Sequence, residues 1–578
     1  MAEKRGQSFL GGAAVLIAGT MLVKIIGAFF KIPLTNIVGG AGMGYFMTAY
    51  SFFNPIYALS VAGFPVAVSK LVSQANALGQ RETADRIYRT ALWLFPMIGL
   101  LLSLAIGFGA GGVLQLVGNP SAYLATVAIA PALLFACVSS VYRGYHEGTR
   151  NMRPTASSQV VEAVAKLVFG ILLAVAAVRY GLGCFENGLL VYGAAAANEA
   201  EAMRAIAPVA AAGAVLGVTL STAAGALYLA LFHPVKRNNI TAKNAPFPGE
   251  KLNHPALRLL SVALPVCLSA LVINLTSMVD LVTVMNRLGK AIELDLPAVI
   301  ASHPDAGLSA IGAGELPNFL YGSYTGLALT VFHLVPSVTA SLGVSALPMI
   351  SELWAKKRRG PLRCSAESVL KITAAVAIPA GLGMTVLAEP ILSLLFCANQ
   401  SEVLVAAPLL RILGIAAIFS AMTAPVNSML QAVGRIYAPV KLMALGGIVK
   451  LLANVLTVAI PSVNVTGAAW GTLLCYLVIL LGGLSVLLRE IDANLNLVFL
   501  FAKPLAAAAL CAGTAWAGYG FLFRATGSGL SVLPAVAAGA LVYAVSLLLL
   551  RTITPDDLRL LKNGPKFEKY LAKKNLLG

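Results

Sequence analysis

The sequence predicts an all-α integral membrane protein with about fourteen transmembrane helices, arranged as two six-helix lobes and a C-terminal helix pair. Hydrophobic residues make up 58% of the 578 residues, while charged residues make up only 11%, well below the share of about a quarter in soluble domains. The apolar runs are about 20 residues long, the length of a helix that spans a bilayer. In hydrocarbon only helices and closed barrels satisfy their own backbone groups, and runs of this length favour helices.

Each span is read from one apolar run, and the runs are bounded by charged, glycine-rich or proline-containing connections. The expected spans are 9–32, 44–72, 91–116, 121–142, 155–178, 207–232, 257–284, 319–350, 371–396, 403–430, 439–460, 465–488, 500–522 and 530–550.

The distribution of basic residues predicts the orientation. Most of the 41 lysines and arginines fall in alternate connections, and cytoplasmic connections are the ones enriched in these residues. The outside connections hold Arg179, Arg204, Arg287, Lys290 and Arg524. Both termini are therefore expected in the cytoplasm, with 552–578 as a basic cytoplasmic tail.

An internal repeat predicts the two lobes. The segment PVAVSKLVSQ from Pro65 resembles LPMISELWAK from Leu347, and the turn before Pro154 resembles the turn before Pro439. Similar offsets at both places indicate a repeat of six helices, so the two copies have the same orientation in the membrane. The expected domains are an N-terminal lobe at 1–240, a C-terminal lobe at 241–490, a helix pair at 491–551 and the tail.

Motifs for catalysis, metal binding or cofactor binding are missing from the sequence. The seven cysteines show no CxxC spacing, and neither a GxxxxGK[ST] loop nor an HExxH pair occurs. Basic residues are spread over many short connections instead of forming one patch, which argues against nucleic acid as a partner. We expect a transporter and no enzyme, with no metal and no cofactor.

Three segments resemble one known family: YRGYHEGTRNMRPTASSQVVE from Tyr142, KIIGAFFKIPLTNIVGGAGMGYF from Lys24 and LRILGIAAIFSAMTAPVNSMLQAVGR from Leu410. They resemble the stage V sporulation protein B and polysaccharide biosynthesis proteins, which include MurJ-like lipid II flippases. These belong to the multidrug, oligosaccharidyl-lipid and polysaccharide exporter superfamily.

The resemblance implies a fold like that of MATE transporters and a place in the bacterial cytoplasmic membrane. It also implies flipping, by alternating access, of lipid II or a related undecaprenyl-pyrophosphate-linked saccharide. MurJ-type flippases tend to have arginines in the first helix, where this chain has Lys24 and Lys31.

Charged residues within the spans are candidates for the cavity, because a charge in hydrocarbon usually faces a cavity or a partner. We expect Lys24, Lys166, Arg411 and Lys450 to bind the substrate headgroup. Lys166 and Lys450 occupy corresponding positions in the two repeats. Lys31 is read more simply as an interface anchor.

The acidic residues within the spans have two readings each. Glu162 and Asp280 could couple transport to a cation or form structural ion pairs, and Glu162 lies four residues before Lys166 on the same helix face. Cytoplasmic Arg143, Arg150 and Arg153 could meet the headgroup on entry, but they are read first as topology signals.

Two other functions stay open. A cation-coupled multidrug exporter of the same fold would use Asp280 and Glu162, and a membrane polymerase or ligase of polysaccharides is a weaker alternative because the outer connections offer no catalytic cluster. The excess of basic residues in the spans favours an anionic substrate. The sequence sets neither the saccharide nor the oligomeric state, and a monomer would suffice.

Overall fold

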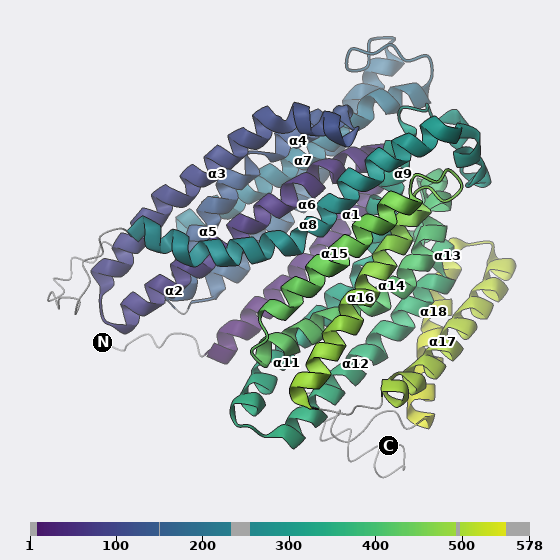
Figure 1. Cartoon of the computed structure of the whole chain (residues 1–578). Helices are drawn as coiled ribbons and strands as arrows, with labels where there is room; N and C mark the ends of the chain where they lie inside the picture. Colours follow the sequence, from purple (N-terminus) through teal and green to yellow (C-terminus); the bar gives the residue numbers. More distant parts are fainter. Residues whose placement is uncertain (1–8, 150, 233–254, 493–496, 551–578) are drawn as a thin grey trace. The chain divides into compact units, whose positions relative to one another are not determined.

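The computed structural model describes residues 9–149, 151–232, 255–492 and 497–550. All secondary-structure elements within these residues are helices. The single β-type contact among them is an isolated antiparallel bridge between Val191 and Ala194. The chain folds into two compact units, Met1–Asn286 and Arg287–Gly578 (Figure 1). The prediction of an all-α protein is therefore confirmed.

The first unit is a bundle built around α1, α5, α6 and α7. Its helices are α1 (Phe9–Ala58), a π-helical turn η1 (Leu59–Gly63), α2 (Phe64–Ala77), α3 (Arg81–Val117), a 3-10 turn η2 (Pro120–Ala122), α4 (Tyr123–Ile129), α5 (Ala132–Gly148), α6 (Arg153–Glu186), α7 (Glu199–Phe232) and the first part of α8 (Pro255–Ala301).

The second unit holds the remainder of α8 and the C-terminal helices. They are η3 (Pro304–Ala306), η4 (Leu308–Ala310), α9 (Leu316–Gly322), a π-helical turn η5 (Ser323–Ala328), α10 (Leu329–Phe332), α11 (Leu334–Ala355), α12 (Arg359–Val386), α13 (Ala388–Leu395), α14 (Gln400–Ala432), α15 (Tyr437–Thr457), α16 (Thr466–Ile491), α17 (Leu497–Thr526), η6 (Gly529–Ser531) and α18 (Val532–Leu549).

Eleven helical segments of the described residues are long and apolar enough to cross a membrane. The first, Ala18–Asn76, covers 59 residues and takes in two of the expected spans. The chain breaks within it at Gly39, which has φ 68° and ψ 179°, a conformation that glycine adopts without a steric penalty. The first helix thus runs beyond residue 32, where the sequence predicted its end, and the total of fourteen stays a prediction.

The helices of the first unit approach closely where small residues face each other. A Cβ atom on Gly217 of α7 would lie 2.3 Å from the Cα of Gly170 on α6, so only glycine permits this crossing. Gly144 on α5 meets Pro65 of α2 in the same way, since a Cβ there would lie 2.7 Å from the Pro65 carbonyl oxygen. Small residues at such crossings are typical of helix packing in membranes.

In the second unit α14 lies at the centre and packs against α11, α12 and α16. The helix pair α17 and α18 is attached to α12, where the Tyr543 hydroxyl donates a hydrogen bond of 2.7 Å to the Ala375 carbonyl. Near the end of α8 the backbone leaves the helix at Asp295, whose carboxylate then accepts from the Ala298 amide at 3.0 Å. This contact caps the helical turns that follow.

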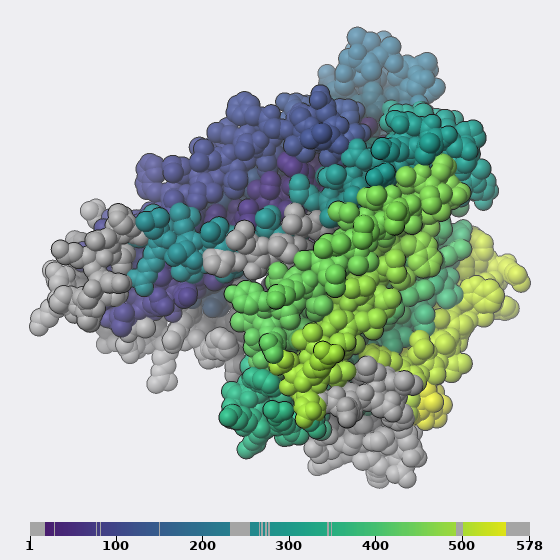
Figure 2. Space-filling model, viewed as in Figure 1, coloured from purple at the N-terminus to yellow at the C-terminus, as the bar shows by residue number. Residues whose placement is uncertain are grey.

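The outward surfaces of both units are apolar. Figure 2 shows α3 at the surface of the first unit and α15 and α16 at the surface of the second. On α3, Trp93 is 80% exposed and Phe108 is 88% exposed, and α15 exposes Ile448 and Leu452. Large apolar side chains in these positions suit contact with lipid chains.

The expected lobe boundary at 240/241 lies among residues 233–254, which are outside the described part of the chain, as is the tail at 552–578. The first part of α8 packs with the first unit, because the Cys267 thiol donates to the Leu59 carbonyl at 3.2 Å. The division into two lobes of six helices stays a prediction.

Candidate functional site

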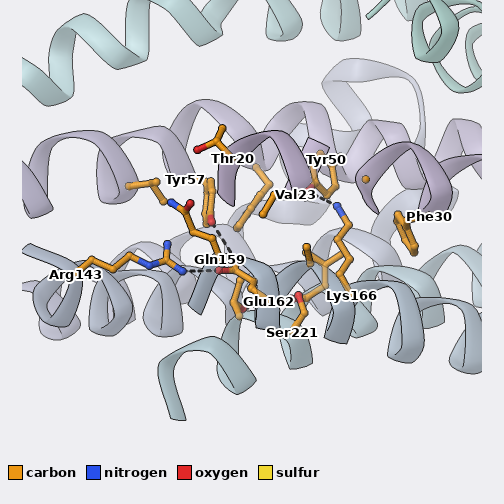
Figure 3. Close-up of a pocket in the computed structure, with 16 residues that line it drawn as sticks. Thr20, Val23, Phe30, Tyr50, Tyr57, Arg143, Gln159, Glu162, Lys166 and Ser221 are labelled. Carbon is orange, nitrogen blue, oxygen red and sulfur yellow. Dashed lines mark hydrogen bonds and ion pairs between the residues drawn. The ribbon is translucent and has the colours of Figure 1, made fainter. Parts of the chain in front are cut away.

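A cavity of about 290 Å³ opens inside the first unit, between α1, α5, α6 and α7 (Figure 3). Its volume is close to the lower end of the range for small-molecule sites, about 300 to 1,000 Å³. Charged, aromatic and hydroxyl-bearing side chains face it, among them Tyr50, Tyr57, Arg143, Glu162 and Lys166. Such a lining provides polar groups that can orient a ligand inside an otherwise apolar bundle.

At one end of the cavity Arg143 is held by α6. Its Nη2 atom lies 2.8 Å from Oε2 of Glu162 in an ion pair, and its Nε donates to the Ser158 hydroxyl at 3.1 Å. The Tyr57 hydroxyl of α1 donates to Oε1 of Glu162 at 3.3 Å. The two charged side chains are only 6% and 18% exposed, so the ion pair is largely removed from solvent.

At the other end Lys166 is held by neutral groups. Its Nζ donates to the Tyr50 hydroxyl at 2.8 Å and lies over two rings, 4.6 Å from the Tyr50 centroid and 4.9 Å from that of Phe30. Aromatic faces and a hydroxyl stabilise an ammonium group without neutralising it. The ammonium group of Lys166 therefore lies within reach of a ligand in the cavity.

The tyrosines that hold these charges belong to a row of aromatic residues along α1. Phe46 stacks on Tyr50 at 5.3 Å between ring centroids, and Phe53 lies 5.1 Å from Tyr57. Figure 3 shows Tyr50 and Tyr57 pointing from α1 toward Lys166 and Glu162. Neither tyrosine was among the predicted site residues, although aromatic side chains at positions 46, 50, 53 and 57 repeat on one helix face.

The structure changes the interpretation of the arginines assigned to the cytoplasmic turn. Arg143 lies within α5, buried in the bundle, because that helix continues to Gly148 beyond the expected end at 142. Arg153 begins α6 and is exposed, and Arg150 lies outside the described residues. Of Arg143 and Arg153, only Arg143 lines the cavity.

The expected alternative of an ion pair between Glu162 and Lys166 does not match the geometry. Glu162 forms its ion pair with Arg143, while Lys166 donates to Tyr50. The partner of Glu162 comes from another helix, which spacing along α6 could not indicate.

The lysines of α1 lie beside the cavity. Thr20, Val23, Gly27 and Phe30 form the stripe of α1 that lines it, whereas Lys24 projects from an adjoining face and is exposed. Lys31 is half-buried and lies close enough to Lys166 for the two side chains to interact electrostatically. Since α1 continues past it to Gly39, Lys31 is not at a helix end as the sequence suggested.

The remaining candidates lie elsewhere. Asp280 is buried on α8, and Lys450 is buried on α15 of the second unit. Arg411 on α14 is exposed and lies 3.8 Å from the Glu389 carboxylate in the first turn of α13, so it links α14 to the start of α13. None of these three residues lines the cavity of the first unit.

A search of the described residues finds no group of three or more histidine, cysteine, aspartate or glutamate side chains placed to hold a metal ion. The cavity instead combines two cations, one carboxylate and several hydroxyls. This set is suited to binding an anion by charge-assisted hydrogen bonds.

A family model described as polysaccharide biosynthesis protein matches residues 9–354, which is more than half of the chain. The chain belongs to that family. A second model, described as lipid II flippase MurJ, matches residues 323–537.

Two curated proteins are similar to this chain over most of its length. Stage V sporulation protein B of Bacillus subtilis (strain 168) is 23% identical over 96% of this chain and 97% of its own length. Lipid II flippase MurJ of the same organism is 24% identical, covering 83% of this chain and 82% of that protein.

Solved structures show the fold of this family member. A structure of lipid II flippase MurJ in an inward closed conformation matches with a TM-score of 0.62 and 14% identity, over 93% of this chain and 98% of that one. An inward-facing multidrug resistance MATE family transporter of the MOP superfamily matches with a TM-score of 0.59 and 16% identity, over 84% of this chain and 100% of that one. The expected MATE-like fold is confirmed, and the chain is a multi-pass membrane protein. The matching MurJ and MATE proteins are named as a flippase and a transporter.

Proposed function

We propose that this protein is a flippase that moves an undecaprenyl-pyrophosphate-linked saccharide across the bacterial cytoplasmic membrane by alternating access. The observation that carries the proposal is the cavity of the first unit, where Lys166 and Arg143 outnumber the single carboxylate of Glu162. A site with excess positive charge attracts an anionic headgroup and disfavours a cationic drug.

Lys166 is the first contact that we assign to the headgroup phosphate. Its ammonium is held at 2.8 Å by a hydroxyl and by ring faces, so an incoming phosphoryl oxygen would meet an uncompensated charge. The tyrosine rings beside it offer flat apolar surfaces and hydroxyls, which suit a saccharide. Lys24, Arg411 and Lys450 stay proposed contacts for other stages of the transport cycle.

Lipid II is the substrate that we test first. Two of the matching proteins are named lipid II flippases, and stage V sporulation protein B matches along nearly its whole length. Lipid II and related polysaccharide precursors share the undecaprenyl-pyrophosphate group, so the cavity charge supports the shared group and leaves the saccharide to the experiment.

A cation-coupled multidrug exporter is the second candidate. The MATE transporter with a TM-score of 0.59 has this fold, and Glu162 provides a carboxylate inside the cavity. If the protein were such an exporter, it would confer drug resistance, and its loss would cause no defect in cell-wall synthesis. The exporter would also need a cavity whose net charge favours organic cations.

Reconstitution in liposomes separates these functions. Purified protein is incorporated into vesicles with labelled lipid II, with an unrelated undecaprenyl-pyrophosphate-linked glycan, or with a cationic dye. We expect the lipid-linked glycans to cross and the dye to stay. Transport of the dye alone would reject the flippase, and transport of only one glycan would define the substrate.

A further inference from the structure

The charges of the cavity in the first unit do not match those of a pyrophosphate headgroup. Its lining holds two cations, Arg143 and Lys166, and one carboxylate, Glu162, which leaves one positive charge on the lining when all three are ionised. Lys31 interacts electrostatically with Lys166 but is not part of the lining. A pyrophosphate esterified at both ends carries two negative charges. A complex of the two would leave one negative charge uncompensated in a region of low dielectric, which is unfavourable.

Glu162 also occupies one edge of the Arg143 guanidinium. The Nη2 atom of Arg143 is bonded to Glu162 at 2.8 Å and its Nε to Ser158 at 3.1 Å, which uses two of its five N–H donors. A phosphoryl oxygen can therefore pair with the edge formed by Nε and Nη2 only if the carboxylate releases it. An ionised Glu162 left beside the phosphate would then repel it, because like charges in one site disfavour each other.

The other groups facing Glu162 cannot balance this charge. From α1 comes the hydroxyl of Tyr57, and from α5 comes Arg143. Lys166 follows one turn later on α6 and already contributes its charge. On α7, Gly225 lies beside the carboxylate, since a Cβ atom there would lie 3.4 Å from Oε2, and Ser221 and Thr222 of the same helix are neutral.

We propose that Glu162 takes up one proton when a doubly charged pyrophosphate headgroup binds, which releases Arg143 to the phosphate. The inference rests on the proposed function and deepens it. The proton comes from water and forms an O–H bond on the carboxylate, while the Nη2–H of Arg143 turns from the carboxylate to a phosphoryl oxygen. The cavity then holds two positive charges against two negative ones.

The consequence is that headgroup binding depends on pH through one residue. Where Glu162 is ionised in the free protein, uptake of one proton weakens binding about tenfold for each unit of rising pH. A glutamine at this position is already neutral, so it removes the dependence and leaves Arg143 available at every pH.

The experiment measures equilibrium binding of a dialkyl pyrophosphate diester to the full chain in detergent, between about pH 5 and about pH 9. A diester lacks the second ionisation near pH 6 that phosphate monoesters show, so the charge of the probe is constant. Wild type is compared with Glu162→Gln, and Glu186→Gln serves as the control because Glu186 is exposed at the end of the same helix.

We expect affinity to fall with rising pH in wild type and Glu186→Gln and to stay constant and high in Glu162→Gln. Calorimetry of wild type in two buffers with different ionisation enthalpies should show one proton taken up per bound diester, and this measurement needs no variant. Binding of the diester by wild type without proton uptake would overturn the inference and leave the flippase standing. Failure of wild type to bind the diester at any pH would overturn the anionic cavity of the proposed function as well.

Discussion

Arg143 on α5 and Glu162 on α6 form an ion pair with 2.8 Å between Nη2 and Oε2, at the end of the cavity in the first unit. The pair joins two helices that the sequence separates by a turn. Because both side chains are largely buried, each depends on the other for compensation of its charge.

Removal of one partner should destabilise the protein. Arg143→Met leaves the Glu162 carboxylate buried without its cation, and we expect a loss of roughly 3 to 5 kcal/mol in the free energy of unfolding. The double variant Arg143→Met/Glu162→Met should recover most of it, since apolar replacement of a buried pair is often neutral. Thermal denaturation in detergent measures both, and Arg411→Met is the exposed control, expected to change stability by about 1 kcal/mol or less. A double variant as unstable as the single one would contradict the pairing.

Loss of the Lys166 charge should reduce transport. Lys166→Met removes a charge-assisted contact of about 1.5 to 3 kcal/mol, so we expect flipping of labelled lipid-linked glycan in proteoliposomes to slow by roughly 10- to 100-fold. Lys166→Arg should keep part of the activity. The control is Lys70→Met, because Lys70 is an exposed lysine on α2 of the same unit. Normal transport by Lys166→Met would remove Lys166 from the site.

The close crossing of α6 and α7 should tolerate no side chain at Gly217. Gly217→Ala would place a Cβ atom 2.3 Å from Gly170 and force the helices apart, with an expected loss of about 1 to 3 kcal/mol in stability. Gly183→Ala is the matched control on α6, since nothing lies within 4 Å of its Cβ position. It should be neutral or stabilising by up to about 1 kcal/mol. Equal effects of the two changes on thermal stability would show that the crossing is looser than the structure has it.

Stability should fall at acidic pH through His303, which lies between α8 and η3. Burial lowers the pKa of His303 below its ordinary value of 6.5, and its Nδ1 lies 2.8 Å from the Ser302 hydroxyl, which also accepts from Asn464 at 2.7 Å. Above about pH 6.5 the ring is neutral in folded and unfolded protein, so its titration contributes nothing.

As pH falls through that value, the unfolded chain binds the proton first, and folding loses up to about 1.4 kcal/mol per pH unit until the folded pKa is reached. Melting curves of wild type and His303→Gln, recorded near neutral and near acidic pH, measure the difference. The variant should be less sensitive to acid than wild type. An identical acid response in both proteins would rule out His303 as its source.

Two exposed cysteines test the proposed orientation. Cys364 lies near the start of α12 and Cys397 follows α13, so the proposed topology puts Cys364 in the cytoplasm and Cys397 outside. In variants that retain Cys364 or Cys397 as the single cysteine of the chain, a membrane-impermeant maleimide applied to intact cells should label Cys397 and spare Cys364 until the cells are opened. The reverse pattern would invert the topology.

The sequence by itself determined the fold class and the family. Hydropathy and charge patterning are local properties of a chain in lipid, because each spanning helix must be apolar over its own length and satisfy its own backbone. The same reasoning found Lys166 and Glu162, since a charged residue inside a span usually has a role or a partner.

Only the tertiary structure decided which charges meet. Arg143 was read as part of a turn because its helix continues past the apolar run, and Tyr50 and Tyr57 were passed over because a tyrosine in a span is ordinary. Their roles depend on which faces of α1, α5 and α6 point into one cavity, and that depends on helix crossings set by glycines such as Gly170 and Gly217. The pairing of Glu162 with Arg143 instead of Lys166 is a contact between helices, and spacing along one helix holds no information about it.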